Sequence, residues 1–189
     1  MIRNQESERH LSPGEQERYE PIPATSEIHL LFEGDQRDRR EGLQKADMAA
    51  YLSHEKDRAA RAHEIYEAYK VGDAVLTPRE CAELAMIFHH RDNAEDYYVA
   101  YELAKTAVEN GEHDARWLQA AAEDRYLLSI GKRQKWGTQF RKENGKWSYD
   151  GVLAPDAESG ITDEMRAGMN VPIRSEQLQA IAEKYKERK

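Results

Sequence analysis

The chain has 189 residues, the length of one ordinary domain, and this is long enough to bury a stabilising core. Its formal net charge of -8 opposes wrapping by a phosphate backbone, so we expect no nucleic-acid partner. No apolar run approaches the roughly 18 residues of a membrane span and the first residues lack an apolar leader core, so we expect a cytoplasmic protein without a membrane partner.

The pattern along the chain is mainly helical. Residues 1–24 are rich in Glu, Arg, Gln and Pro, which predicts a disordered N-terminal arm. Apolar residues at helical spacing begin after this arm, so residues 25–189 are expected to form a single domain. The fold class predicted is a compact helical bundle with a small β-hairpin.

Helix-capping residues mark where the first helices begin. Thr25 or Ser26 is expected to cap a short helix, and a second helix is expected from about residue 46 to 70. Thr77 is the predicted N-cap of a third helix, with Pro78 at the first helical position, where its missing N–H costs nothing. Later helices are expected to begin at Asn93, at His113 or Asp114 (ending before Gly131), at Thr162 or Asp163 after a loop, and at Ser175 for a terminal helix over 175–187.

A change of pattern after Gly131 predicts the hairpin. Asn144 and Gly145 lie between short runs that contain Phe140 and Trp147. Asn-Gly is the strongest short-range signal for a tight β-turn, so the hairpin is expected over residues 138–150.

The middle helices have a weak internal repeat. The segment "AYELAKTAVENGEHDARWL", residues 100–118, resembles the helix-turn-helix units of tetratricopeptide-like repeats. Only about one and a half units are visible, so we expect repeat-like packing inside a compact bundle and not an extended solenoid.

Two neighbouring histidines are the first candidates for chemistry. His89 and His90 lie near the end of their predicted helix and point about 100° apart, so they cannot share one metal ion from that helix alone. One interpretation makes His90 a general base. The structural alternative leaves one histidine exposed near the helix end and the other hydrogen-bonded in the core.

A charged pair interrupts an otherwise apolar helix and is the second candidate. Asp124 and Arg125 must face solvent or be paired, because burying an unpaired charge is costly. Arg125 either grips a carboxylate or phosphate of a ligand, or hydrogen-bonds the carbonyl groups of the following loop. Asp35 and Asp38 form a weaker candidate cation site, with ion pairing to the interleaved arginines as the favoured interpretation.

Four segments together resemble a known family. They are "LFEGDQRDR", "LAMIFHHRD", "ARWLQAAAEDRYLL" and "GKRQKWGTQF", within residues 28–175. They resemble a bacterial family of uncharacterised proteins, a domain of unknown function, marked by Gln-His, Asp-Arg and Gln-x-Tyr-Gly-Thr-Gln. This resemblance implies functional positions at His90, Asp124, Arg125, Gln134, Gly137, Thr138 and Gln139, and it implies no reaction. His89 and Trp136 stand where the family usually has Gln and Tyr.

The sequence supports two hypotheses about function. The first is a small-molecule or peptide site, with catalytic capacity, between the His90 helix, the Arg125 helix and the loop 134–139; His90 and Arg125 are its catalytic candidates. Its ligand-binding candidates are Asp124, Gln134, Trp136, Thr138 and Gln139. The second is a non-enzymatic helical-repeat module whose helices present a groove and whose acidic surface selects a basic peptide partner. No metal-ligand spacing is compelling, and no cofactor follows from the sequence.

Overall fold

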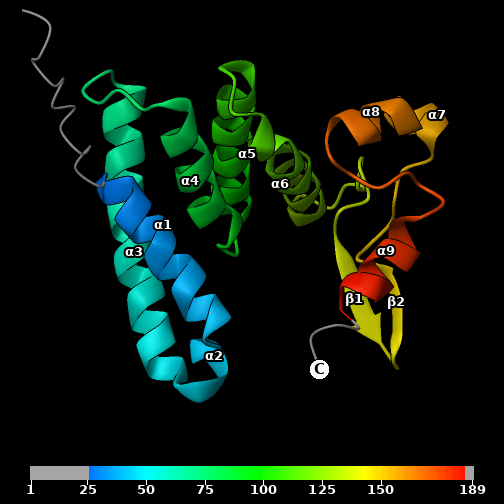
Figure 1. Cartoon of the computed structure of the whole chain (residues 1–189), viewed down its shortest axis with the longest axis horizontal. Helices are drawn as coiled ribbons and strands as arrows, with labels where there is room; N and C mark the ends of the chain where they lie inside the picture. The colour runs from blue at the N-terminus through cyan, green and yellow to red at the C-terminus, as the bar shows by residue number, and fades with distance from the viewer. Residues whose placement is uncertain (1–25, 186–189) are drawn as a thin grey trace, which may run out of the picture.

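The computed structural model describes residues 26–185 of the chain. The predicted arm over residues 1–24 lies outside these described residues. A helical body occupies one side of the molecule, and a smaller part with the hairpin and three short helices lies on the other side (Figure 1). The expected class, mainly helical with a small hairpin, is confirmed.

The helical body contains α1 to α6, and the smaller part contains the remaining elements. The helices of the body are α1 (Glu27–Arg40), α2 (Leu43–Ala46), α3 (Met48–Lys70), α4 (Pro78–His89), α5 (Ala94–Glu109) and α6 (Arg116–Ser129), with a 3-10 turn, η1 (His113–Ala115), before α6. The smaller part contains β1 (Phe140–Glu143), β2 (Lys146–Tyr149), α7 (Asp156–Ser159), α8 (Asp163–Gly168) and α9 (Gln177–Lys184).

The predicted caps begin three of the helices in the body. The Ser26 hydroxyl accepts a hydrogen bond from the backbone of α1, and Asn93 caps α5 in the same way. At α4, Thr77 and Glu80 form a reciprocal capping box, and Pro78 occupies the first helical position. Because these caps are local interactions, the sequence alone was sufficient to place them.

The structure differs from the expected helix boundaries at three short segments. The helix expected from residue 46 begins at Met48, because Asp47 is extended and its side chain caps the new helix. The separate helix α2 precedes it and was not predicted, and α7 forms where a loop was expected. Ser175 lies in a turn, and α9 begins at Gln177 without a side-chain cap.

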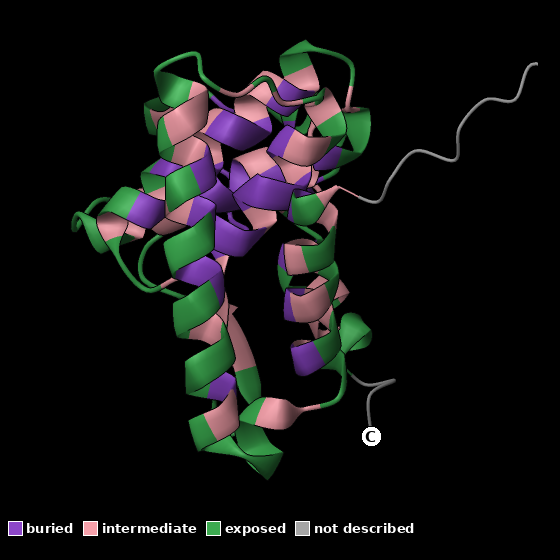
Figure 2. Ribbon diagram, turned by 90° about the vertical axis from the view of Figure 1, so that its left-hand side faces the viewer, coloured by how far each residue is buried: buried purple, intermediate pink, exposed green. Residues whose placement is uncertain are grey.

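The main core lies between α4, α5 and the helices on either side of them. The long middle helix α5 packs against both α4 and α6, while α1 crosses α4. Buried residues gather in the centre of the body, and the lower ends of the long helices are mostly exposed or half-buried (Figure 2). The buried side chains of this core include Ala62, Leu84, Ala85, Phe88, Ala100, Leu103, Ala104 and Ala107.

A second, smaller core holds the C-terminal part against α6. It consists of Ala120, Trp136, Ile161 and Val171. Trp117 of α6 packs against both cores, so α6 is the element that the two parts share.

The hairpin forms at the predicted Asn-Gly turn. Strands β1 and β2 are antiparallel, and Glu143 pairs with Lys146 directly beside the turn. Asn144 and Gly145 both have positive φ angles, 49° and 79°, as a tight two-residue turn requires. Among residues 26–185, no helix combines the length and the apolar character needed to cross a membrane.

Candidate functional site

Arg125 connects the three elements that the sequence proposed as walls of a site. Its Nη1 donates to the backbone carbonyl of His89 at 2.6 Å, at the end of α4. Its Nε donates to Oε1 of Gln139 at 3.0 Å, in the loop after α6, and the guanidinium lies over the ring of Tyr97. The α4 end, α6 and the loop therefore meet at one side chain; we call this meeting point, with Asp35 and His90, the junction.

Asp124 organises the backbone of the loop. Its Oδ1 accepts from the amides of Lys135 and Trp136 at 2.7 and 2.9 Å. Its Oδ2 accepts from the amides of Gly137 and Thr138, both at 2.9 Å, and from the Thr138 hydroxyl at 2.8 Å. Burial raises the pKa of this carboxyl, and the hydrogen bonds from the loop oppose that rise. Both oxygens only accept, so the ionised form fits this arrangement.

The two glutamines of the loop hold its ends together. Gln134 is fully buried; its side-chain nitrogen donates to the carbonyls of Gln139 and Asp150, and its oxygen accepts from the Gln139 amide. The side-chain nitrogen of Gln139 donates to the carbonyl of Ala121 and to the Thr138 hydroxyl. The polar side chains of Gln134, Thr138 and Gln139 thus make hydrogen bonds that shape the loop itself.

Trp136 lies in the second core and is 6% exposed. Its indole N–H donates to Glu123 at 2.6 Å, and Lys135 pairs with the same carboxylate at 3.0 Å. The ring therefore closes the interface between α6 and the C-terminal part.

The partly exposed His90 forms a hydrogen-bonded pair with the buried Asp35 of α1. The distance from His90 Nδ1 to Asp35 Oδ2 is 2.8 Å, and the side chains are 18% and 1% exposed. Since a carboxylate only accepts, the proton of this bond lies on Nδ1. The second ring nitrogen of His90, Nε2, has no hydrogen-bond partner within residues 26–185. An imidazole oriented by a carboxylate in this way can take up or release a proton at its free nitrogen.

His90 and Arg39 favour the ionised form of Asp35. Burial alone would raise the pKa of Asp35, but His90 and Arg39 outweigh it and hold the pKa below its ordinary value. Arg39 Nε donates to Asp35 Oδ1 at 3.1 Å. The Nη2 of Arg39 is buried and makes no hydrogen bond within the part of the chain that the structure describes, but it forms an ion pair with Oε2 of Glu55 at 3.5 Å. Arg39 therefore links the pair to the carboxylate of Glu55 on α3.

His89 is the more buried of the two histidines, at 3% exposed. Its ring lies edge-on to Trp117, and its Nδ1 has no hydrogen-bond partner among residues 26–185. Burial, followed by the charges of Arg125 and His90, places the pKa of His89 well below its ordinary value, so the ring is neutral at physiological pH. The structural alternative expected one exposed histidine and one that is hydrogen-bonded in the core. His89 does lie in the core, but the hydrogen-bonded histidine is the more exposed His90.

Asp38, the other member of the candidate cation site, is ion-paired, and the single cysteine of the chain is buried. Asp35 pairs with the interleaved Arg39, as the ion-pairing interpretation expected, whereas Asp38 pairs with Arg58 and His54 of α3. Burial raises the pKa of the Cys81 thiol to about 11, so the nucleophilic thiolate is scarce at neutral pH. Within residues 26–185 no three His, Cys, Asp or Glu side chains are grouped so that they could hold a metal ion.

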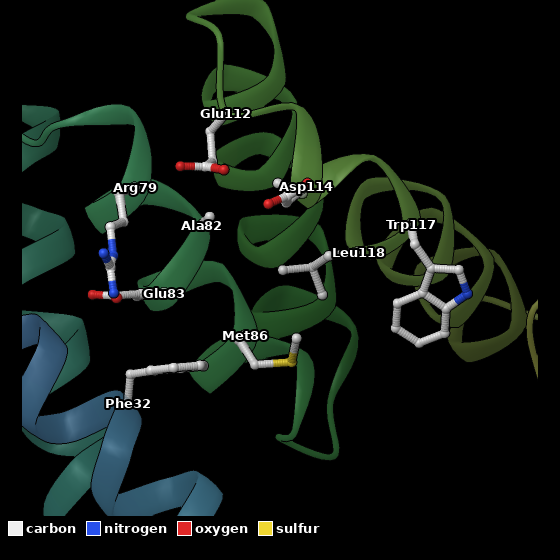
Figure 3. A pocket seen from close by; sticks show the side chains of 10 residues that line it. Phe32, Arg79, Ala82, Glu83, Met86, Glu112, Asp114, Trp117 and Leu118 are labelled. Carbon is white, nitrogen blue, oxygen red and sulfur yellow. The ribbon is translucent and has the colours of Figure 1, made fainter. Parts of the chain in front are cut away.

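An open groove beside the junction has a volume of about 460 Å³ and is bounded by α1, α4 and α6 (Figure 3). Met86 lines it on α4, and His89 and His90 follow three and four residues later, on the same helix face. Phe32 lines it on α1, and Asp35 follows three residues later. The groove is lined by Phe32, Arg79, Ala82, Glu83, Met86, Glu112, Asp114, Ala115, Trp117 and Leu118.

The structure thus brings Arg125 and Gln139 together at the end of α4, whereas the His90 side chain contacts Asp35 of α1 and makes no hydrogen bond with Arg125 or Gln139 within residues 26–185. Asp124, Gln134 and Thr138 support the loop, and Trp136 belongs to the second core. Sequence reasoning did not connect Asp35 with His90. The available signal was the helical spacing of Asp35 and Arg39 on an otherwise amphipathic helix, which marks one shared face.

Comparison of the chain with protein-family models, with curated proteins and with solved structures finds no match.

Proposed function

We propose that this protein binds a small molecule at the junction and that His90 acts on it as an acid–base group. One observation carries the proposal: Asp35 orients His90 through Nδ1, and Nε2 has no hydrogen-bond partner among the residues that the structure describes. Buried carboxylate–imidazole pairs are the usual means by which enzymes hold a histidine ready for proton transfer.

In this proposal the remaining junction residues orient the pair and the ligand. Arg125 fixes the end of α4 that carries His90, because it holds the carbonyl of the preceding residue. Arg39 anchors Asp35 through Nε and is itself held by the carboxylate of Glu55 through Nη2. The loop 134–139 buttresses Arg125 through Gln139. The resemblance to a family of uncharacterised proteins points to the same positions and adds no reaction.

Ligand-induced thermal stabilisation tests the proposal. A library of carboxylates, phosphates and amines is screened against the wild-type protein, His90→Gln and Asp35→Asn, with His113→Gln as the matched control, since His113 is exposed and lies outside the junction. A ligand whose free concentration is about 100 times its Kd raises the free energy of unfolding by about 2.7 kcal/mol. In a chain of this size that raises Tm by roughly 5–10 °C.

We expect a ligand whose effect on Tm is kept in His113→Gln and lost in both junction variants. Ligands that stabilise all four proteins equally bind elsewhere and would contradict the proposal. So would a library without any stabilising compound.

A further inference from the structure

The floor of the groove beside the junction is apolar. Phe32, Met86 and Trp117 line it, and all three are half-buried at the edge of the main core. In Figure 3 the Met86 side chain extends across the groove floor between Phe32 and Trp117. Half-buried apolar side chains gain stability when a partner covers them, at about 25 cal/mol per Å² of apolar surface removed from water.

The upper rim of the same groove carries an excess of negative charge. Glu83, Glu112 and Asp114 face it together with only one cation, Arg79 (Figure 3). Arg79 is already paired with Glu83, at 2.9 Å, and Glu83 also contacts His29. The side chains of Glu112 and Asp114 make no hydrogen bond or ion pair with any residue that the structure describes.

These two carboxylates lie where a bound segment would pass. Glu112 precedes η1, and Asp114 lies within it, directly before the α6 residues that form one wall. An apolar floor beside unpaired carboxylates is complementary to a segment that has apolar side chains on one face and Lys or Arg next to them. The groove volume of about 460 Å³ accommodates a few side chains, not a folded domain.

We propose that the groove binds a basic amphipathic segment of a partner protein. Its apolar side chains cover Phe32, Met86 and Trp117, and its Lys or Arg side chains pair with Glu112 and Asp114. The inference goes beyond the proposed function, because none of these five residues belongs to the junction. The two can therefore fail separately.

Fluorescence anisotropy with a synthetic probe tests the proposal. The probe is a labelled fourteen-residue peptide with Leu at positions i, i+3, i+4 and i+7 and Lys on the other face, designed by the usual spacing of a helical apolar stripe. A scrambled peptide of the same composition lacks that stripe, and a third peptide has Glu in place of Lys. The double variant Glu112→Gln/Asp114→Asn is compared with Glu41→Gln/Asp57→Asn, which removes the same charge from exposed positions outside the groove.

We expect the wild-type protein to bind the probe more tightly than either control peptide, and the binding to weaken in high salt. The double variant at the rim should bind roughly threefold to tenfold more weakly, as for two exposed ion pairs, while the control variant stays within about twofold. The His90→Gln variant should bind the probe as the wild type does, which separates this inference from the proposed function.

Three results would overturn it: equal binding by the rim variant and the wild type, equal binding of the scrambled peptide, or a groove occupied by a second copy of the chain. Sedimentation velocity detects the last case as a dimer that the rim variant abolishes. The rim carboxylates make no bonds within the described chain, so both charge variants should fold, and a circular dichroism melt confirms this.

Discussion

His89 occupies a position where a positive charge would destabilise the folded protein. Its ring is buried beside the positive groups Arg125 and Arg39, so protonating it would place a cation next to other cations without access to water. The unfolded chain has no such restriction, and there His89 takes up a proton near its ordinary pKa of about 6.5. The difference makes the stability of the fold depend on pH.

The direction of this dependence follows from the lowered pKa. Below about pH 6.5 the unfolded state binds a proton that the folded state refuses, so stability is present above this pH and falls as the pH decreases. Between pH 7 and pH 5 this one residue therefore lowers the free energy of unfolding. Urea unfolding should show that His89→Gln removes this part of the pH dependence.

The exposed His113 provides the control for that measurement. His113→Gln should keep the wild-type slope of unfolding free energy against pH. Equal slopes in the two variants would mean that His89 is protonated in the folded protein.

The site residues differ in how far the sequence could reveal them. His90 and Arg125 were identifiable because each interrupts an apolar helix, and such interruptions need a reason. Asp35 is 55 positions away from His90, and no local pattern reports which helix faces meet. The roles of Gln134 and Thr138 were equally hidden, since their partners are backbone groups brought near only by the folded loop.

The loop between α6 and β1 is an element fixed from two sides. Asp124 holds its amides from α6, and Gln177 of α9 donates to the carbonyl of Trp136 at 2.8 Å from the other side. Gly137 lies between them with φ of 83°, and a Cβ at this position would overlap the Gln177 side chain. A side chain at position 137 would therefore displace the Gln177 amide from its hydrogen bonds with Trp136 and Tyr149, which connect α9 to the loop and the hairpin.

We expect Gly137→Ala to destabilise the protein by roughly 2–4 kcal/mol, since it combines an unfavourable φ with a clash against a buried side chain. Amide exchange in α9 should accelerate more than in α5. Gly168→Ala is the matched control, because Gly168 ends α8 without a positive φ and has open space around it. This control should be neutral or slightly stabilising, and a similar loss in both variants would contradict the clash.

Helix starts and the hairpin were predictable from the sequence where capping or turn residues within the element itself determine them. The starts of α1, α4 and α5 follow from side-chain caps, and the hairpin follows from Asn144 and Gly145. The short helices α2 and α7 have no side-chain cap hydrogen bond and only four residues each, so tertiary contacts decide whether they form. The start of α9 is of the same kind, because Gln177 is buried by its contacts with distant residues.

At the scale of the whole molecule, the two cores differ in size. The core of the helical body has many buried members, whereas the C-terminal part depends on Ala120, Trp136, Ile161 and Val171. Fewer buried apolar contacts mean a lower local stability, so the smaller part should open before the body does.

Hydrogen exchange measured by mass spectrometry checks this order. Ile161→Ala shortens a side chain that is 2% exposed, so it should lower the free energy of unfolding by about 2–5 kcal/mol. Its effect should be largest over residues 134–171 and small in α4 and α5. Leu103→Ala, in the main core, should accelerate exchange throughout α4, α5 and α6. Uniform acceleration by both variants would show instead that the molecule unfolds as one unit.

The way Asp124 binds the loop also bears on how this protein can change over evolution. Four of its five hydrogen bonds come from main-chain amides, which every residue except proline possesses. The shape of the loop therefore does not depend on which side chain stands at position 135. New side chains can be introduced there while the backbone stays in place, so surface chemistry next to Glu123 is free to diverge without loss of the fold.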